Sequence, residues 1–268
     1  MASITTIMLR VCDGAAARFA IFAAACFGLQ HAQAACPDGR APIYLTFDTG
    51  SQSQAILIRD ILKKYDVKAT FFLANEKTVA GDFSLDPSWS AYWKSLVADG
   101  HAFGTHTFDH VYFKADASGA TVMIRPQFGA HAGQAMRWTS ADYCDELNRV
   151  KTRFQALTGA TLDPFWRAPG GKVSARLIGF GKACGYRHFA WADAGFLGDE
   201  LPSDRYPNAM LLERAKKNLR AGDIVMAHLG IWSRKNSFAP TLDPLIASLK
   251  QQGHCFATLR DVPTDVRS

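Results

Sequence analysis

Four short segments of the chain carry side chains that could do hydrolytic chemistry. They are Thr46-Phe47-Asp48-Thr49-Gly50, His106-Thr107-Phe108-Asp109-His110, Arg167-Ala168-Pro169-Gly170 and Ile224-Val225-Met226-Ala227-His228. In the first segment, the apolar run 43–45 leads Asp48 into a glycine turn, as a buried parallel strand delivers a catalytic group to the carboxyl-terminal rim of an α/β sheet or barrel. Asp48 is therefore either a general base at that rim or the N-cap of the helix that follows.

Three histidines could complete such a site. His106 and His110 are four residues apart just beyond an expected strand, so a helical turn would place both imidazoles on one side. Such a pair suits Zn²⁺ or a similar metal, although histidines also cap helices and pack in cores. His228 ends another expected strand, where an imidazole with a pKa near neutrality can protonate a leaving amine.

Alternating strands and helices must position these groups. Short apolar runs predict strands at Ile43–Phe47, Ala69–Leu73, His101–Thr105, Pro164–Arg167, His188–Trp191, Asp223–Ala227 and Cys255–Leu259. Three- and four-residue apolar spacing predicts helices at Ser53–Tyr65, Trp89–Ala98, Ser140–Leu157, Ala175–Cys184, Ala209–Leu219 and Leu242–Gln251; in the first, Ile56, Leu57, Ile61 and Leu62 form the apolar face. This α/β order predicts a parallel sheet with right-handed crossovers, either a barrel or an open doubly wound sheet.

In this order the four segments resemble the polysaccharide deacetylase family (NodB homology, carbohydrate esterase 4). The resemblance implies a single-domain, distorted (β/α)7-type barrel of parallel strands over residues 35–268. It implies a metal-dependent hydrolase that removes N-acetyl groups from peptidoglycan, chitooligosaccharide or poly-N-acetylglucosamine, with Zn²⁺ or another divalent metal such as Co²⁺. The corresponding residues here are His106 and His110 as metal ligands, Asp48 as base, Arg167 and Asp193 beside it, His228 as acid, Gly170 as an oxyanion donor, and Trp191 and Met226 around the acetyl methyl group.

Two positions depart from the family pattern. The first motif of the family usually reads Thr-Phe-Asp-Asp-Gly, and its second Asp binds the metal, but this chain has Thr49 there. A neutral hydroxyl is a poor ligand for a dication, so metal occupancy is in question. After the proline of the third motif the family usually carries a Tyr, and this chain has Gly170, which keeps a backbone donor but loses the aromatic wall. These departures motivate an alternative, a catalytically impaired carbohydrate-binding relative with a decayed metal site, whereas the retained Asp48, Arg167 and His228 favour the enzyme.

The N-terminus resembles a secretory signal peptide. Arg10 and Arg18 precede the apolar stretch 19–29, and Ala32-Gln33-Ala34 is a cleavage pattern, which predicts a signal over residues 1–34 and a periplasmic or extracellular protein. The stretch is too short for a membrane span, which needs about 20 residues, so no stable membrane insertion is expected after cleavage. A net charge of +6, with basic residues scattered, gives no reason to expect nucleic acid. The oligomeric state is left open.

Four cysteines remain beyond the signal: Cys36, Cys144, Cys184 and Cys255. An exported protein can join them in three ways, or they can be buried thiols. We favour Cys36–Cys255, near the first and last strands, with Cys144–Cys184 on consecutive helices. One long segment, residues 111–139, has no clear periodicity and is expected to be an inserted loop beside the substrate groove.

Overall fold

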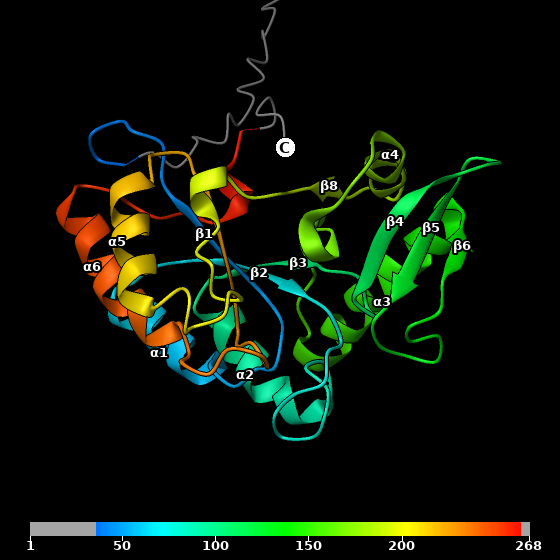
Figure 1. Ribbon diagram of the computed structural model, residues 1–268, viewed down its shortest axis with the longest axis horizontal. Coiled ribbons are helices and arrows are strands. Elements are labelled where there is room, and N and C mark those ends of the chain that lie inside the picture. The colour runs from blue at the N-terminus through cyan, green and yellow to red at the C-terminus, as the bar shows by residue number, and fades with distance from the viewer. Residues whose placement is uncertain (1–35, 264–268) are drawn as a thin grey trace, which may run out of the picture. The chain divides into compact units, whose positions relative to one another are not determined.

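The computed structural model describes residues 36–263, and the predicted signal peptide lies outside them. This part of the chain contains a six-stranded parallel sheet in the order β8-β7-β3-β2-β1-β9 (Figure 1). The strands are β1 (Tyr44–Asp48), β2 (Thr70–Leu73), β3 (Ala102–Thr105), β7 (Phe165–Trp166), β8 (Arg187–His188) and β9 (Ile224–His228). The first three strands are buried along their whole length, as continuous apolar runs of a parallel sheet must be.

The sheet curls into an incomplete barrel. Beyond β8, the N–H of Ala192 donates to the carbonyl of Ile224, and the N–H of Leu197 donates to that of Met226. Phe196 also forms a parallel bridge with Met226, so the chain after β8 returns along β9 without becoming a regular strand. The expected α/β barrel of parallel strands in a single domain is confirmed in this curled form.

The seventh predicted strand, Cys255–Leu259, is the exception. It contributes one parallel bridge between Phe256 and Ile43 and then enters the short 3-10 helix Leu259–Asp261. The edge of β1 beyond Ile43 is already taken by β2, so only a few residues at the start of the strand can pair with this segment.

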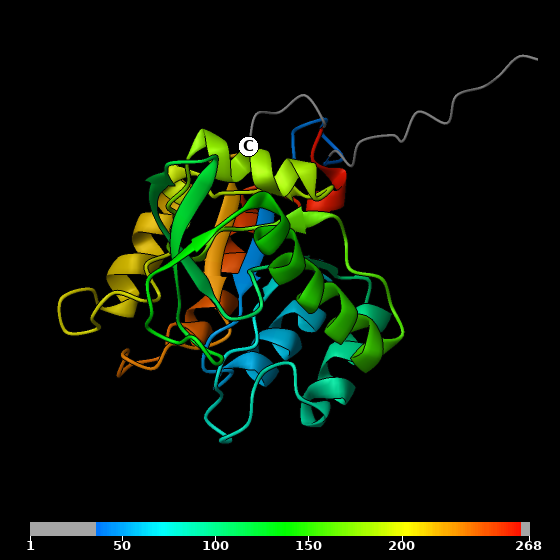
Figure 2. The same ribbon diagram turned by 90° about the vertical axis from the view of Figure 1, so that its right-hand side faces the viewer.

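The helices agree with the predicted ranges to within two residues. They are α1 (Ala55–Lys64), α2 (Ser90–Ala98), α3 (Ser140–Thr158), α4 (Ala175–Ala183), α5 (Asn208–Asn218) and α6 (Leu242–Gln251). They contact one another in the orders α5–α6–α1 and α2–α3–α4 and cover the outside of the sheet (Figures 1 and 2). The apolar face assigned to α1 is partly wrong, because Ile56 and Leu57 are exposed while Ala55, Ile58, Ile61 and Leu62 are buried.

Segment 111–139 is not the loop that its irregular sequence suggested. It forms a second, antiparallel sheet of β4 (Val111–Ala117), β5 (Thr121–Pro126) and β6 (Met136–Trp138). A bulge between Phe113 and Ala115 interrupts the alternation of buried and exposed residues, which hides the strand in the sequence. This sheet lies to one side of the barrel, next to α3 (Figure 1).

Both favoured disulfides are present. Cys36–Cys255 joins the start of the described chain to the segment that pairs with Ile43, and Cys144–Cys184 joins α3 to the end of α4. None of the helices between residues 36 and 263 has the length and apolar character needed to cross a membrane.

Candidate active site

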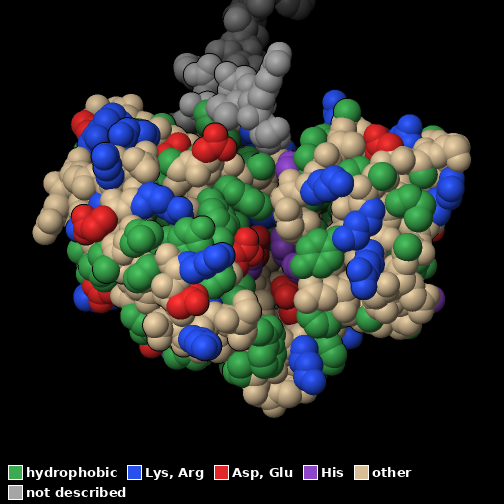
Figure 3. Space-filling model, viewed as in Figure 1, with side chains coloured by type: hydrophobic (Ala, Val, Ile, Leu, Met, Phe, Trp, Pro, Cys, Tyr) green, Lys and Arg blue, Asp and Glu red, His purple; other side chains and the backbone are tan. Residues whose placement is uncertain are grey.

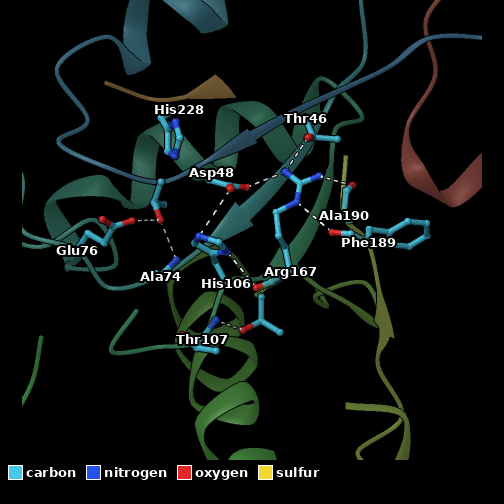
Figure 4. A network of polar contacts seen from close by, with 12 residues as sticks. Thr46, Asp48, Ala74, Glu76, His106, Thr107, Arg167, Phe189, Ala190 and His228 are labelled. Atoms are coloured by element: carbon cyan, nitrogen blue, oxygen red, sulfur yellow. Dashed lines mark hydrogen bonds and ion pairs between the residues drawn. The ribbon is translucent and has the colours of Figure 1, made fainter. Parts of the chain in front are cut away.

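Asp48 lies at the centre of a buried polar cluster at the carboxyl end of the sheet (Figure 4). The parallel register places Asp48 opposite His228 on β9, so both side chains emerge at the same rim. Asp48 as a whole is 2% exposed. One of its oxygens accepts a hydrogen bond of 2.9 Å from Nη1 of Arg167, and the other is 3.6 Å from Nε2 of His106. Three of the four motifs thus meet at one carboxylate, as the rim argument predicted.

Arg167 is fixed by more contacts than the ion pair. Its guanidinium is completely buried and also donates to the hydroxyl of Thr46 at 2.8 Å. It further donates to the carbonyls of Phe189 and Ala190, at 3.1 and 3.2 Å, in the segment after β8. Burial alone would raise the pKa of Asp48, but the positive charge of Arg167 outweighs burial and holds that pKa below its ordinary value. Asp48 is therefore ionised at neutral pH.

His228 has a carboxylate partner that the sequence did not reveal. Nδ1 of His228 donates to Asp199, 3.1 Å from Oδ1, and the backbone N–H of His228 donates to Oδ2 at 2.6 Å. Burial opposes the charged imidazole, but the charge and hydrogen bond of Asp199 outweigh it and raise the pKa of His228 to about 9. The imidazolium is thus the main form at neutral pH, with Nε2 available to donate a proton.

Asp193, predicted to lie beside Asp48, is not brought into this cluster. Its side chain is exposed at the start of a short 3-10 helix, Asp193–Gly195. Asp199 is the buried acidic residue of this region, and it contacts His228 rather than Asp48. The spacing of residues in the sequence does not show which of the two aspartates is buried. The irregular path of the chain from β8 to β9 decides it.

His106 and His110 fit the role of metal ligands in part. Nδ1 of His106 donates to the carbonyl of Arg167 at 3.0 Å, which directs the unprotonated Nε2 toward Asp48. Burial lowers the pKa of His106 to about 3, so the imidazole is neutral, as a ligand must be. His110 is also buried, its Nδ1 has no hydrogen-bond partner among the described groups, and its ring centroid is 5.0 Å from that of His106. The pair is held by a tight turn with positive φ at Thr107 and His110, not by a helical turn.

Thr49 occupies the position at which the family carries its third metal ligand. The hydroxyl of Thr49 accepts from the N–H of Ala74 at 3.0 Å and donates to Oε1 of Glu76 at 2.7 Å. Glu76 is itself buried, so a carboxylate stands one hydrogen bond away from the position where the family carries its aspartate. Between residues 36 and 263, no three His, Cys, Asp or Glu side chains are grouped closely enough to hold a metal ion by themselves. The two imidazoles therefore suit a divalent metal, and the third ligand position does not.

The remaining predicted residues line the surroundings of the cluster. Met226 is buried on β9, two residues before His228 and hence on the same side of the strand. The Trp191 ring is half-buried, 5.6 Å from the guanidinium carbon of Arg167. Gly170 has a φ of 68°, in the left-handed region that favours glycine. A Cβ atom at position 170 would lie 3.1 Å from Cε1 of Tyr112.

Tyr112 corrects the expectation that the aromatic wall is lost. Its ring comes from β4 and stands next to Gly170, with its centroid 5.0 Å from that of His110. The site is open to solvent on this side, where Figure 3 shows a hollow with histidine and acidic side chains inside it. Sequence reasoning missed Tyr112, Glu76 and Asp199 for one reason: each comes from outside the motifs and reaches the site only through the tertiary fold.

The chain is similar to known proteins over most of its length. The family model for polysaccharide deacetylase matches residues 36–189. A peptidoglycan N-acetylmuramic acid deacetylase of Bacillus subtilis is 27% identical over 221 residues, covering 82% of this chain and 70% of that protein. A chitooligosaccharide deacetylase of Azorhizobium caulinodans is 25% identical over 232 residues, covering 82% and 93%.

Solved structures share the fold. An acetyl xylan esterase from Clostridium thermocellum in complex with a cobalt ion has a TM-score of 0.61 at 21% identity, covering 82% of this chain and 88% of that one. A CE4-family pseudoenzyme from Bacillus anthracis has a TM-score of 0.60 at 21% identity, covering 83% and 65%. With a family model that spans more than half of its length and motifs that meet at one buried carboxylate, this chain belongs to the polysaccharide deacetylase family.

Proposed function

We propose that this protein is an exported, metal-dependent deacetylase that hydrolyses the N-acetyl groups of an amino-sugar polymer. The observation that carries the proposal is the placement of Asp48, paired with Arg167, opposite His228, paired with Asp199, at the same rim; these partners favour an ionised Asp48 and a protonated His228. A base and an acid held in these opposite states at neutral pH are what amide hydrolysis requires. The family membership and the named activities of the relatives support the same reaction.

Each residue has a defined task in the proposed reaction. Asp48 accepts a proton from the attacking water, while Arg167 keeps the carboxylate charged and oriented. As the water oxygen bonds to the acetamide carbon, the N–H of Gly170 donates to the developing oxyanion. His228 then gives its Nε2 proton to the nitrogen as the C–N bond breaks, so the products are acetate and a free amine. Trp191 and Met226 line the pocket of the acetyl methyl group, and Asp193 has no part.

The metal of this proposal is Zn²⁺ or a similar ion such as Co²⁺, held by His106 and His110. When bound, it would act as a Lewis acid that polarises the carbonyl and lowers the pKa of water. The neutral state of His106 and the unpartnered Nδ1 of the buried His110 support this assignment. Thr49 does not supply a charge to the ion, so we expect weaker binding than an aspartate at that position would give.

Release of acetate tests the proposal. The mature chain with added Zn²⁺ is incubated with peptidoglycan, chitooligosaccharides and poly-N-acetylglucosamine, and His228→Ala is compared with His131→Ala, which removes an exposed histidine. We expect acetate from at least one glycan, unchanged by His131→Ala and about 10²–10⁴-fold slower for His228→Ala, the usual contribution of a general acid. No acetate from any glycan, with all three proteins indistinguishable, would contradict the proposal.

A second candidate function rests on Thr49 and on the similarity to a pseudoenzyme fold. In this alternative the protein binds the glycan without cleaving it. Metal analysis of the purified protein separates the two candidates, because stoichiometric zinc supports the enzyme and no zinc after soaking supports the binder.

A further inference from the structure

The second sheet places an aromatic ring and two cations around one cavity beside the candidate active site. The cavity has a volume of about 400 Å³ and is lined by Tyr112, Lys114, Arg125, Pro126, Gln127 and Gly133. Tyr112 and Arg125 are directly opposite each other in the β4–β5 register and therefore project from the same face. Figure 3 shows basic side chains on the half of this surface that carries β4–β6, next to the central hollow.

Tyr112 links this cavity to the reaction centre. The half-buried ring stands beside Gly170 and His110 on one side and borders the cavity on the other. Its hydroxyl donates to Oε1 of Gln127 at 3.0 Å, which fixes the ring plane. An aromatic ring that lines a cavity is a surface on which a sugar ring can stack, and this ring also stands beside Gly170 and His110 of the candidate active site. The cavity is thus positioned for the sugar next to the one that is deacetylated.

The two cations are held in place without a carboxylate partner among the described residues. Nε of Arg125 donates to the carbonyl of Gly133 at 2.9 Å, and Nζ of Lys114 lies 5.3 Å from the centroid of the Tyr112 ring. Lys172 adds a third positive charge nearby, because its ammonium donates to the carbonyl of Lys114 at 2.7 Å. The ion pairs of this part of the chain involve other residues. A cavity lined by two cations that take part in no ion pair among the described residues, next to an aromatic ring, favours a sugar that carries a negative charge.

We propose that Tyr112, Lys114 and Arg125 form a subsite for a carboxylate-bearing sugar unit adjacent to the reacting N-acetyl group. The sugar stacks on Tyr112, and its carboxylate binds Arg125 and Lys114. This inference rests on the proposed function and specifies its substrate as an anionic amino-sugar polymer. In a peptidoglycan strand the carboxylate is either that of a muramic acid free of peptide or that of an attached peptide, and the substrates below separate these two sources.

Kinetics on three oligosaccharides of equal length test the subsite. They are a peptide-free strand containing N-acetylmuramic acid, the same strand bearing peptides, and a neutral chitooligosaccharide. For Arg125→Gln and Lys114→Gln we expect KM to rise about tenfold on the peptide-free acidic strand, the loss expected for a charge-assisted hydrogen bond, with kcat unchanged. KM on the neutral oligosaccharide should not change. Tyr112→Ala should raise KM on both, because the stacking ring is lost.

Arg137→Gln is the matched control, because it removes an exposed cation from β6, outside the cavity. A rise of KM that is equal for acidic and neutral glycans, or equal for Arg125→Gln and Arg137→Gln, would overturn the subsite while leaving the deacetylase function intact. If the effect occurs only on the peptide-bearing strand, the proposed sugar carboxylate is wrong and the peptide is the source.

Binding separates a failure of the subsite from a failure of the proposed function. If no glycan releases acetate, calorimetric titration of the same oligosaccharides into wild-type protein still measures affinity. Preference for the acidic strand, lost in Arg125→Gln and weakened by salt, would support the subsite without catalysis. Equal affinity for acidic and neutral strands, or no binding of either, would refute it.

Discussion

At the scale of single residues, the protonation state of each catalytic group is set by the oppositely charged residue that contacts it. Asp48 is buried and His228 is partly buried, and burial alone would favour the neutral form of each. Arg167 keeps the first charged as an anion, and Asp199 keeps the second charged as a cation. Two ion pairs therefore set up base and acid at the ends of adjacent strands β1 and β9.

The dependence of kcat on pH should reflect the protonation of His228, which Asp199 stabilises. His228 donates a proton only when charged, so kcat should fall as the pH rises through about 9, the pKa that Asp199 gives it. Asp199→Asn keeps a hydrogen-bonding side chain but removes the charge, so this alkaline limb should move down toward 6.5. The measurement is acetate release between pH 5 and 10 in both proteins.

The Asp199–His228 pair should also make the free energy of unfolding depend on pH. The pKa of His228 is raised on folding, so its stabilisation is fully present below pH 6.5, the ordinary value, and is lost as pH rises through about 9. Asp199→Asn should therefore destabilise the fold more at pH 6 than at pH 10. An unchanged alkaline limb together with a pH-independent loss of stability would contradict the assigned role of Asp199.

Position 49 should control metal affinity. Thr49→Asp places a second carboxylate next to Glu76, whose Oε1 accepts from the Thr49 hydroxyl at 2.7 Å. Two buried carboxylates repel each other unless a cation compensates them. We therefore expect Zn²⁺ affinity to rise at least about tenfold, because even a partner of a ligand usually contributes that much. Competition with a chelator measures this affinity. Thr49→Asn, of the same size without the charge, is the control, and equal affinities in the two variants would exclude the charge argument.

At the scale of elements, irregular segments rather than regular strands complete the site. The path from β8 to β9 supplies the carbonyls of Phe189 and Ala190 to Arg167 and carries Asp199 to His228. The antiparallel sheet β4–β6 supplies Tyr112. A single close approach between such a segment and the barrel can decide whether the segment fits.

Gly195 is such a close approach. A Cβ atom at this position would lie 2.0 Å from the carbonyl oxygen of Ile224 on β9, a backbone atom that cannot move aside. Gly195→Ala should therefore displace the segment that carries Asp199 and lower the free energy of unfolding by about 1–3 kcal/mol, as overpacking usually does. It should also lower kcat, since Asp199 loses its place beside His228.

Gly179→Ala is the matched control for that variant. Gly179 is exposed within α4, and a Cβ there meets no atom within 4 Å. Alanine favours a helix over glycine by about 0.5–1 kcal/mol, so this variant should be as stable as the wild type or more so. Urea unfolding with parallel assays checks both, and a Gly195→Ala protein with wild-type stability and kcat would contradict the close approach.

At the scale of the whole molecule, two covalent links hold the described chain together. Cys36–Cys255 closes a sequence separation of 219 residues, and Cys144–Cys184 closes one of 40. The first joins the beginning of the barrel to its end and the second joins neighbouring helices. An exported protein folds where such bonds persist, which agrees with the proposed location.

Removing Cys36–Cys255 should lower the free energy of unfolding more than removing Cys144–Cys184. Deleting a native disulfide typically costs about 2–5 kcal/mol, and loop-closure entropy makes the longer link worth about 1.5 kcal/mol more than the shorter. Cys36→Ser/Cys255→Ser should therefore unfold at lower urea than Cys144→Ser/Cys184→Ser. Equal midpoints for the two double variants would show that the links act through something other than chain entropy.

The sequence alone determined the frame of this protein. Apolar runs that end in Asp48, Arg167 and His228 place those groups at one rim, because parallel strands in a sheet all point the same way. Helix spacing fixed α1 to α6 nearly to the residue, and the cysteine positions indicated the disulfide pairs. The apolar runs and the helix spacing are local patterns of the sequence, and the disulfide pairs follow from the order of the elements along the chain.

Only the tertiary structure decided which partners complete the site. Asp199 rather than Asp193 reaches His228, Glu76 stands next to Thr49, and Tyr112 takes the space beside Gly170. Each of these contacts joins residues whose meeting depends on how an irregular or bulged segment bends. Periodicity cannot predict such bends, because they are set by the packing of the segment against the barrel and not by the order of its residues.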